Sequence, residues 1–111
     1  MFEKDLNMGY LLDFYGELLS ERKRSTMDMY YNEDFSLAEI AEQMGISRQG
    51  VRDIIKKSEE ELIFYEEKLG LAKKMSKAEE QVDELCKLAN SLELPEEIHK
   101  KIIELSMLIR Q

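Results

Sequence analysis

Apolar residues recur at helical spacing along the whole chain, and short polar breaks divide the pattern into separate helices. A first helix is expected over residues 7–19. Its apolar stripe consists of Leu11, Phe14, Tyr15 and Leu18. A second helix follows Ser20, a favourable N-cap, and extends to about residue 31. A third helix begins after Ser36, which forms a capping box with Glu39.

A fourth helix begins after Ser47 and carries the longest regular stripe of the chain. Its stripe follows the steps of four and three found in a heptad repeat, at Val51, Ile55, Ser58, Leu62, Tyr65, Leu69 and Ala72. A second phase includes Met75, Ala78, Val82, Leu85, Ala89 and Leu92. Because Gly70 weakens a helix by roughly 1 kcal/mol relative to Ala, a bend or break is expected within residues 70–77. A last helix starts at Pro95, with Ile98, Ile102, Leu105 and Ile109 directed inward.

These elements predict an all-α fold with a helix-turn-helix head, a long fourth helix and C-terminal helices. The head is expected to comprise residues 1–57, and residues 58–111 a long-helix extension with a dimerising C-terminal segment. A fourth helix of about 25 residues would span roughly 37 Å, so part of its stripe should pack on the C-terminal helices or on another subunit. A symmetric homodimer is favoured, since helix-turn-helix proteins commonly present two reading helices about a two-fold axis.

The segment from residue 37 to residue 56 satisfies each requirement of a helix-turn-helix. Ala41 is small where two helices cross, and Gly45 accepts the positive φ of the turn. Ser47 caps the second helix. Apolar residues on both sides of the turn should lock the pair, namely Ile40, Met44, Ile46, Val51 and Ile54.

The second helix of this motif leaves a set of polar residues outward, which we predict to contact nucleic acid. The set consists of Ser47, Arg48, Gln49, Arg52, Lys56 and Lys57. In a major groove, Arg48 and Arg52 could pair with guanine and Gln49 with adenine, while the two lysines would meet phosphates.

The net charge of the chain argues against binding of nucleic acid. Its net charge is −8, whereas nucleic-acid binding draws mostly on Lys and Arg. Residues 47–57 are the exception, with four basic side chains against one acid, Asp53. The alternative is that these cations form an ordinary solvated helix face, with Lys56 and Lys57 paired to the carboxylates of residues 59–61.

Two resemblances to known families follow from these motifs. Residues 36–57 resemble the promoter-reading helix-turn-helix of bacterial sigma factors, with Ser-Leu-x-Glu-Ile-Ala, Gly-Ile-Ser-Arg and Val-Arg in order. A closer resemblance, to the YlxM family of small bacterial proteins, covers roughly residues 11–69. It rests on Leu-Leu-Asp-Phe-Tyr-Gly-Glu-Leu-Leu (11–19), Tyr-Tyr-Asn-Glu-Asp (30–34), Ile-Ser-Arg-Gln-Gly-Val-Arg-Asp (46–53) and Tyr-Glu-Glu-Lys-Leu (65–69).

The YlxM resemblance implies a helix-turn-helix regulator in the signal recognition particle pathway, since genes of this family usually neighbour those of the particle's GTPase and its receptor. Expected partners are the particle's GTPase, its RNA, or DNA. The alternative function is a transcriptional regulator that reads promoter DNA through the second helix of the motif.

The sequence contains few residues that could support catalysis. His99, the only histidine, lies among charged residues, and Cys86 is flanked by leucines as a structural thiol would be. No phosphate loop, metal-ligand spacing or catalytic triad pattern is present. We therefore expect no catalytic residues, cofactor, metal or small-molecule substrate. Without a membrane-spanning run or a signal-peptide pattern at residues 1–5, cytoplasmic residence is expected.

Overall fold

The computed structural model describes residues 6–110, in which every regular element is helical. The helices are α1 (Leu6–Tyr15), a 3₁₀ turn η1 (Gly16–Leu18), α2 (Glu21–Tyr31), α3 (Leu37–Met44), α4 (Arg48–Leu69), α5 (Leu71–Ser91) and α6 (Glu96–Ile109). The predicted all-α fold, with a helix-turn-helix, a long fourth helix and C-terminal helices, is confirmed. None of the helices within residues 6–110 combines the length and the apolar character that a membrane crossing requires. Residues 1–5, on which the signal-peptide expectation rests, lie outside the described residues.

The chain forms two compact units that meet at Gly70 and Leu71. The sequence pattern places the end of the head at Lys57, but α4 continues to Leu69, and Tyr15 of α1 contacts Tyr65 and Glu66 in its C-terminal part. Gly70 ends α4 in the left-handed conformation (φ 62°), and its amide donates to the Glu66 carbonyl. The break predicted near Gly70 is therefore present, and it separates the first unit from a second unit made of α5 and α6.

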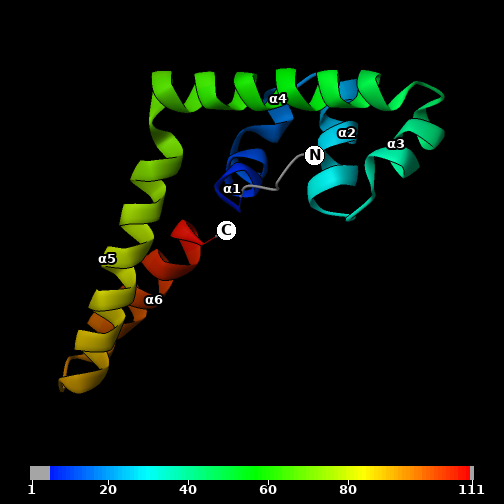
Figure 1. Cartoon of the computed structure of the whole chain (residues 1–111). Coiled ribbons are helices and arrows are strands. Elements are labelled where there is room, and N and C mark those ends of the chain that lie inside the picture. Colours follow the sequence, from blue (N-terminus) through cyan, green and yellow to red (C-terminus); the bar gives the residue numbers. More distant parts are fainter. Residues whose placement is uncertain (1–5, 111) are drawn as a thin grey trace. The chain divides into compact units, whose positions relative to one another are not determined.

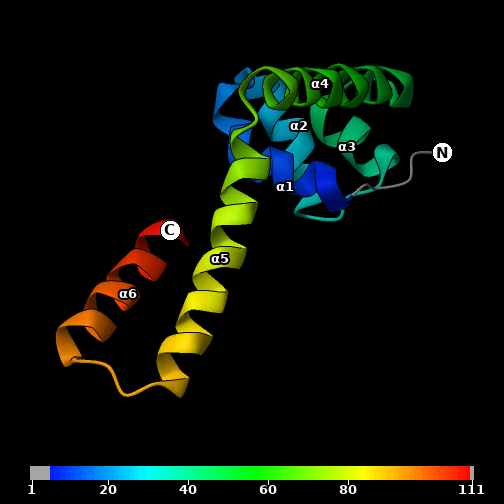
Figure 2. The same cartoon turned by 90° about the vertical axis from the view of Figure 1, so that its left-hand side faces the viewer.

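In the first unit, α1, α2 and α3 all pack on one side of α4 (Figure 1, Figure 2). The centre of the α4 stripe is fully buried at Val51, Ile55, Ser58 and Leu62. The length of the stripe suggests that part of it needs the C-terminal helices or a second subunit. From Val51 to Leu62 the stripe instead belongs to the core of the first unit, because α1, α2 and α3 all pack against α4. Leu69, at the end of α4, is exposed.

Hydrogen bonds and an ion pair between polar side chains also join α4 to α1 and α2. Tyr15 donates its hydroxyl to Glu66 at 2.6 Å, and Lys23 of α2 bonds Glu61 at 2.8 Å. Tyr31 of α2 donates to Glu59. These bonds lie beyond the helix-turn-helix, so they fix the rest of α4 to α1 and α2.

The buried face of α1 differs from the expected one. The buried side chains are Met8, Leu12, Tyr15 and Leu19, whereas Leu18 is exposed. The sequence pattern assumes one continuous helix over residues 7–19. The 3₁₀ turn at Gly16–Leu18 tightens the chain there and shifts the phase, so Leu19 replaces Leu18 in the core.

The second unit consists of α5 and α6, which lie side by side in both views and are joined by residues 92–95 (Figure 1, Figure 2). Asp83 of α5 and Arg110 beyond α6 form an ion pair across the two helices. Its buried residues are small: Ala72, Val82, Ala89 and Ser106. Of the α6 residues expected inward, Ile98 and Leu105 are exposed, because α6 turns Ser106 toward its neighbour instead.

Candidate nucleic-acid interface

The turn between α3 and α4 is built by local sequence signals. Gly45 ends α3 with φ 69°, and the amides of Gly45 and Ile46 both donate to the Ala41 carbonyl. The Ser47 hydroxyl then accepts from the Gly50 amide at 3.0 Å and caps α4. Only three residues therefore separate the two helices, which fixes where α4 begins.

The N-terminus of α3 is closed by the predicted capping box. The Ser36 hydroxyl accepts from the Glu39 amide at 3.1 Å, and the Glu39 carboxylate accepts from the Ser36 amide at 3.0 Å. Hydrogen bonding of the Glu39 carboxylate to the Ser36 backbone amide, and secondarily to the Ser36 side chain, holds the pKa of Glu39 below its ordinary value. The residues around the turn pack as the motif requires, with Ile40 and Val51 fully buried. Met44, Ile46 and Ile54 are half-buried, and Ile55 occupies a fully buried position beside Val51.

All six predicted contact residues are exposed on the first part of α4 or at its cap. Arg48, Arg52 and Lys56 recur at every fourth position and therefore form one row of roughly 12 Å along the helix. Lys57 belongs to the adjacent row, which also contains Gln49 and Asp53. The Gln49 amide donates to the Asp53 carboxylate at 3.0 Å, so contact with a base would require this bond to open.

The four cations at the start of α4 have no ion-paired carboxylate in the part of the chain that the structure describes. Within residues 6–110, no carboxylate lies within ion-pair distance of Arg48, Arg52, Lys56 or Lys57. Two carboxylates of the segment that could have paired with the lysines are engaged elsewhere: Glu59 accepts from Tyr31 and Glu61 from Lys23. The cationic row is therefore available to an external anion.

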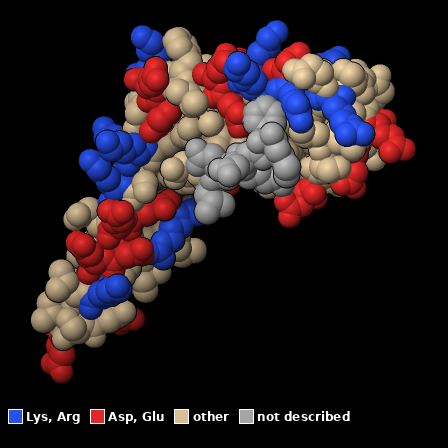
Figure 3. Space-filling model, viewed as in Figure 1, with Lys and Arg blue, Asp and Glu red and all other residues tan. Residues whose placement is uncertain are grey.

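The surfaces beside this row are acidic. On α3, Glu39 and Glu42 are exposed and line a shallow hollow with Phe35 and Gln43. Positive and negative side chains are interspersed over the face of the first unit seen in Figure 3, so no broad positive field is present there. A polyanion would therefore meet favourable charge on α4 rather than on α3.

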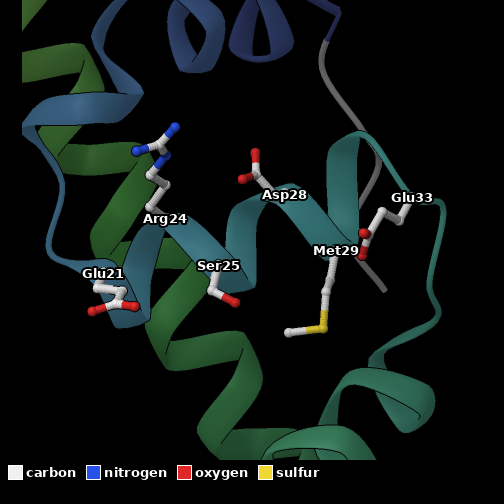
Figure 4. A pocket seen from close by; sticks show the side chains of 6 residues that line it. All are labelled: Glu21, Arg24, Ser25, Asp28, Met29 and Glu33. Atoms are coloured by element: carbon white, nitrogen blue, oxygen red, sulfur yellow. The ribbon is translucent and has the colours of Figure 1, made fainter.

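A second acidic surface lies on α2. A hollow of about 340 Å³ is lined by Glu21, Arg24, Ser25, Asp28, Met29 and Glu33 (Figure 4). Arg24 and Asp28 point to the same side of the helix in this view. With three carboxylates against one guanidinium, the hollow is chemically suited to a basic partner. No group of His, Cys, Asp or Glu within the described residues has a metal-binding arrangement.

The apolar residues exposed beyond this interface were not predicted from the sequence. Ile63 and Phe64 are exposed on the second half of α4, where the Lys68 ammonium lies 5.7 Å from the Phe64 ring centroid. In the second unit Leu88 and Leu108 are exposed. The sequence pattern places Leu85 and Leu92 in one stripe with Val82 and Ala89 and leaves Leu88 out. In the structure Val82 and Ala89 are buried, whereas Leu85, Leu88 and Leu92, which are spaced by three and four, are exposed.

A family model and the similar known proteins point to the same family. The family model described as "Putative helix-turn-helix protein, YlxM / p13 like" (UPF0122) matches residues 2–104. UPF0122 protein YlxM of Bacillus subtilis is 48% identical over 96 residues, which cover 86% of this chain and 87% of the relative. A UPF0122 protein of Halalkalibacterium halodurans is 46% identical over 98 residues, covering 88% and 90%. One from Exiguobacterium sibiricum is 44% identical over 106 residues, covering 96% of each chain. The chain thus belongs to the UPF0122 family of YlxM / p13-like helix-turn-helix proteins.

Proposed function

We propose that this protein is a cytoplasmic regulatory protein of the signal recognition particle pathway, which acts by binding rather than by catalysis and docks on the particle's RNA or GTPase. The link to the pathway comes from the resemblance to the YlxM family. The observation that carries the proposal is the exposed row of Arg48, Arg52 and Lys56 on α4, which forms no ion pair with a carboxylate among the described residues.

The row suits RNA for a physical reason. Each phosphate that a Lys or Arg neutralises releases condensed counterions, so even a short cationic row gives measurable affinity for a polyanion. Arginine adds planar, bidentate hydrogen bonding that lysine lacks. We therefore assign Arg48 and Arg52 as the principal RNA contacts, with Lys56 and Lys57 as phosphate contacts.

The test is binding of the particle's RNA by fluorescence anisotropy at several salt concentrations. Arg48→Ala/Arg52→Ala should weaken binding at least thirtyfold, since a hydrogen bond that involves a charged group contributes about 1.5–3 kcal/mol. It should also make the salt dependence shallower, by about 0.7 to 0.9 in slope for each phosphate that is no longer neutralised. Lys100→Ala/Lys101→Ala on α6 removes the same charge and should change affinity less than threefold. Equal reductions in affinity in both double variants would show non-specific charge attraction and overturn the proposal.

The GTPase is the other candidate partner in the same pathway. The acidic hollow on α2 supports docking on a basic protein surface, because opposite charges steer association. Co-purification of the GTPase that survives nuclease treatment and is abolished in Glu21→Lys/Asp28→Lys would favour this partner. Co-purification that is abolished by nuclease would assign the RNA instead.

Promoter DNA is the alternative target, and the position of Arg48, Gln49 and Arg52 favours it. These residues lie in the first turns of the second helix of the motif, which enters the major groove in helix-turn-helix complexes. The experiment that separates the two is a pull-down from cells of the source organism, with bound nucleic acids sequenced. Enrichment of one promoter fragment, absent with Arg48→Ala/Arg52→Ala, would replace the signal recognition particle proposal.

We further propose that the functional form is a homodimer. A two-fold axis would present two α4 rows to one nucleic acid, and the two rows would then reinforce each other through effective concentration.

A further inference from the structure

The pair of helices α5 and α6 buries too little to be stable by itself. The unit from Leu71 to Gln111 is close to the size of about 40 residues below which chains seldom fold without additional support. Its buried side chains are those of Ala72, Val82, Ala89 and Ser106, all of them small. Most of its larger apolar side chains remain exposed.

Six of these exposed side chains lie on one side of the pair, which we call the hairpin face. They are Leu85, Leu88 and Leu92 on α5 and Ile98, Leu105 and Leu108 on α6. Steps of three and four, or of seven, keep the residues of each helix on one side. A groove of about 320 Å³ joins the two helices, so the two rows open to the same side. It is lined by Gln81, Val82, Glu84, Leu85 and Leu88 of α5 and by Leu105 of α6.

We propose that the hairpin face binds the hairpin face of a second copy of this chain, so that two α5–α6 pairs form a four-helix bundle about a two-fold axis. Such a bundle buries apolar rows of this spacing between facing helices. A two-fold interface places the same patch on both subunits, so the patch must be complementary to itself.

The charges around the hairpin face meet this requirement. Both signs of charge lie on or beside it: Glu84 lines the groove on α5, and Lys101, three positions after Ile98 and four before Leu105, lies within the α6 row, next to the exposed Glu104. The unit as a whole has seven basic and eight acidic residues, against nine and sixteen in the first seventy residues. A second copy therefore meets little repulsion, whereas a strongly basic protein or a nucleic acid finds no matching charge there.

This inference rests on the dimer of the proposed function and adds its interface. The test is the mass of the full chain in solution, measured by sedimentation equilibrium between about 1 and 100 µM. Wild type should have twice the chain mass of 13.1 kDa. Leu88→Glu on α5 and Leu108→Glu on α6 should each raise the dimer dissociation constant at least a hundredfold.

Met107→Glu is the matched control. Met107 is 64% exposed and Leu108 is 67% exposed, and the two are neighbours on α6, but Met107 projects away from the hairpin face. The control should dimerise as wild type does. Circular dichroism at 25 °C should show helix content within a tenth of wild type in all three variants, which excludes simple unfolding.

The possible results test the hairpin face and the existence of the dimer separately. A wild-type dimer that persists in both Leu→Glu variants would overturn the hairpin face and leave the dimer. A wild type that is monomeric at 100 µM would overturn both, and the face would then be covered within one chain or by another protein. Under either result Arg48 and Arg52 could still bind RNA from a single α4 row, although without the reinforcement by a second row, so the RNA proposal is tested separately.

Discussion

Glu61 is held by two side chains in the first unit. It accepts from the Lys23 ammonium at 2.8 Å and from the Tyr65 hydroxyl at 3.1 Å. The hydrogen bond from Lys23 is the main reason that the pKa of Glu61 lies below its ordinary value of 4.5, and the Tyr65 bond acts in the same direction. Burial, followed by the bond to Glu61, raises the pKa of Tyr65. The network links α2 to α4 and therefore contributes stability only while Glu61 is ionised.

This network predicts a pH dependence of stability. Because the folded state lowers the pKa of Glu61, the stabilisation is complete above about pH 4.5 and is lost as pH falls through the lowered value. Glu61→Gln should therefore reduce the free energy of unfolding by about 0.5–1 kcal/mol at pH 7, since the pair is partly exposed. Urea titrations at pH 7 and pH 3 measure the effect, which should be clearly smaller at the lower pH. Glu60→Gln, at the exposed neighbour, should show no such difference; an equal loss at both pH values would contradict the assignment.

The element that carries the proposed interface depends on the short turn before it. Gly45 adopts φ 69°, and nothing lies within 4 Å of a Cβ built there, so the constraint is on the backbone rather than on space. The turn orients α4 only if Gly45 keeps this conformation. If α4 left the turn at another angle, its outward cations would face in another direction relative to α3.

Gly45→Ala is accordingly expected to destabilise the chain by about 1–2 kcal/mol, the cost of a left-handed conformation for a residue with a Cβ. Gly9→Ala is the control, because Gly9 also has open space around it but lies inside α1 without a positive φ. That change should be neutral or stabilising by up to about 1 kcal/mol. Thermal or urea unfolding followed by circular dichroism compares the two. A neutral Gly45→Ala would mean that the turn tolerates another conformation.

At the scale of the whole molecule, the two units differ in how much apolar surface they bury. The first unit buries a core of large apolar side chains, and the second does not. Ile40, Val51, Ile55 and Leu62 are fully buried in the first unit. The hairpin face of the second unit leaves larger side chains exposed than the unit buries. Stability of the second unit is therefore expected to depend on association.

That dependence is measurable as a concentration effect on unfolding. For a dimer, each tenfold increase in concentration favours the associated form by about 1.4 kcal/mol, so the melting temperature should rise between about 2 and 200 µM. Leu88→Glu should melt at the same temperature across that range. Helix content followed by circular dichroism gives the readout. A wild-type melting temperature that is independent of concentration would contradict an associating second unit.

Much of the fold and of the candidate interface could be predicted from the sequence, since their signals act over a few residues. Ser36 with Glu39 and Ser47 with Gly50 make caps within three positions, and Gly45 and Gly70 end helices by accepting positive φ. The outward position of Arg48, Arg52 and Lys56 follows from the same local register. Contact of these residues with nucleic acid stays a prediction.

Only the tertiary structure decided what each apolar stripe packs against. It showed that α1 to α3 cover α4 from Val51 to Leu62, so that this part of the stripe needs no second subunit. It also showed that Glu59 and Glu61 are engaged by α2, which leaves the α4 cations without carboxylate partners among the described residues. A sequence period reveals that a face is apolar but not which partner covers it, because packing joins residues far apart in the chain. For the same reason, the exposure of Leu88 and Leu108 emerged only once α5 and α6 were seen side by side.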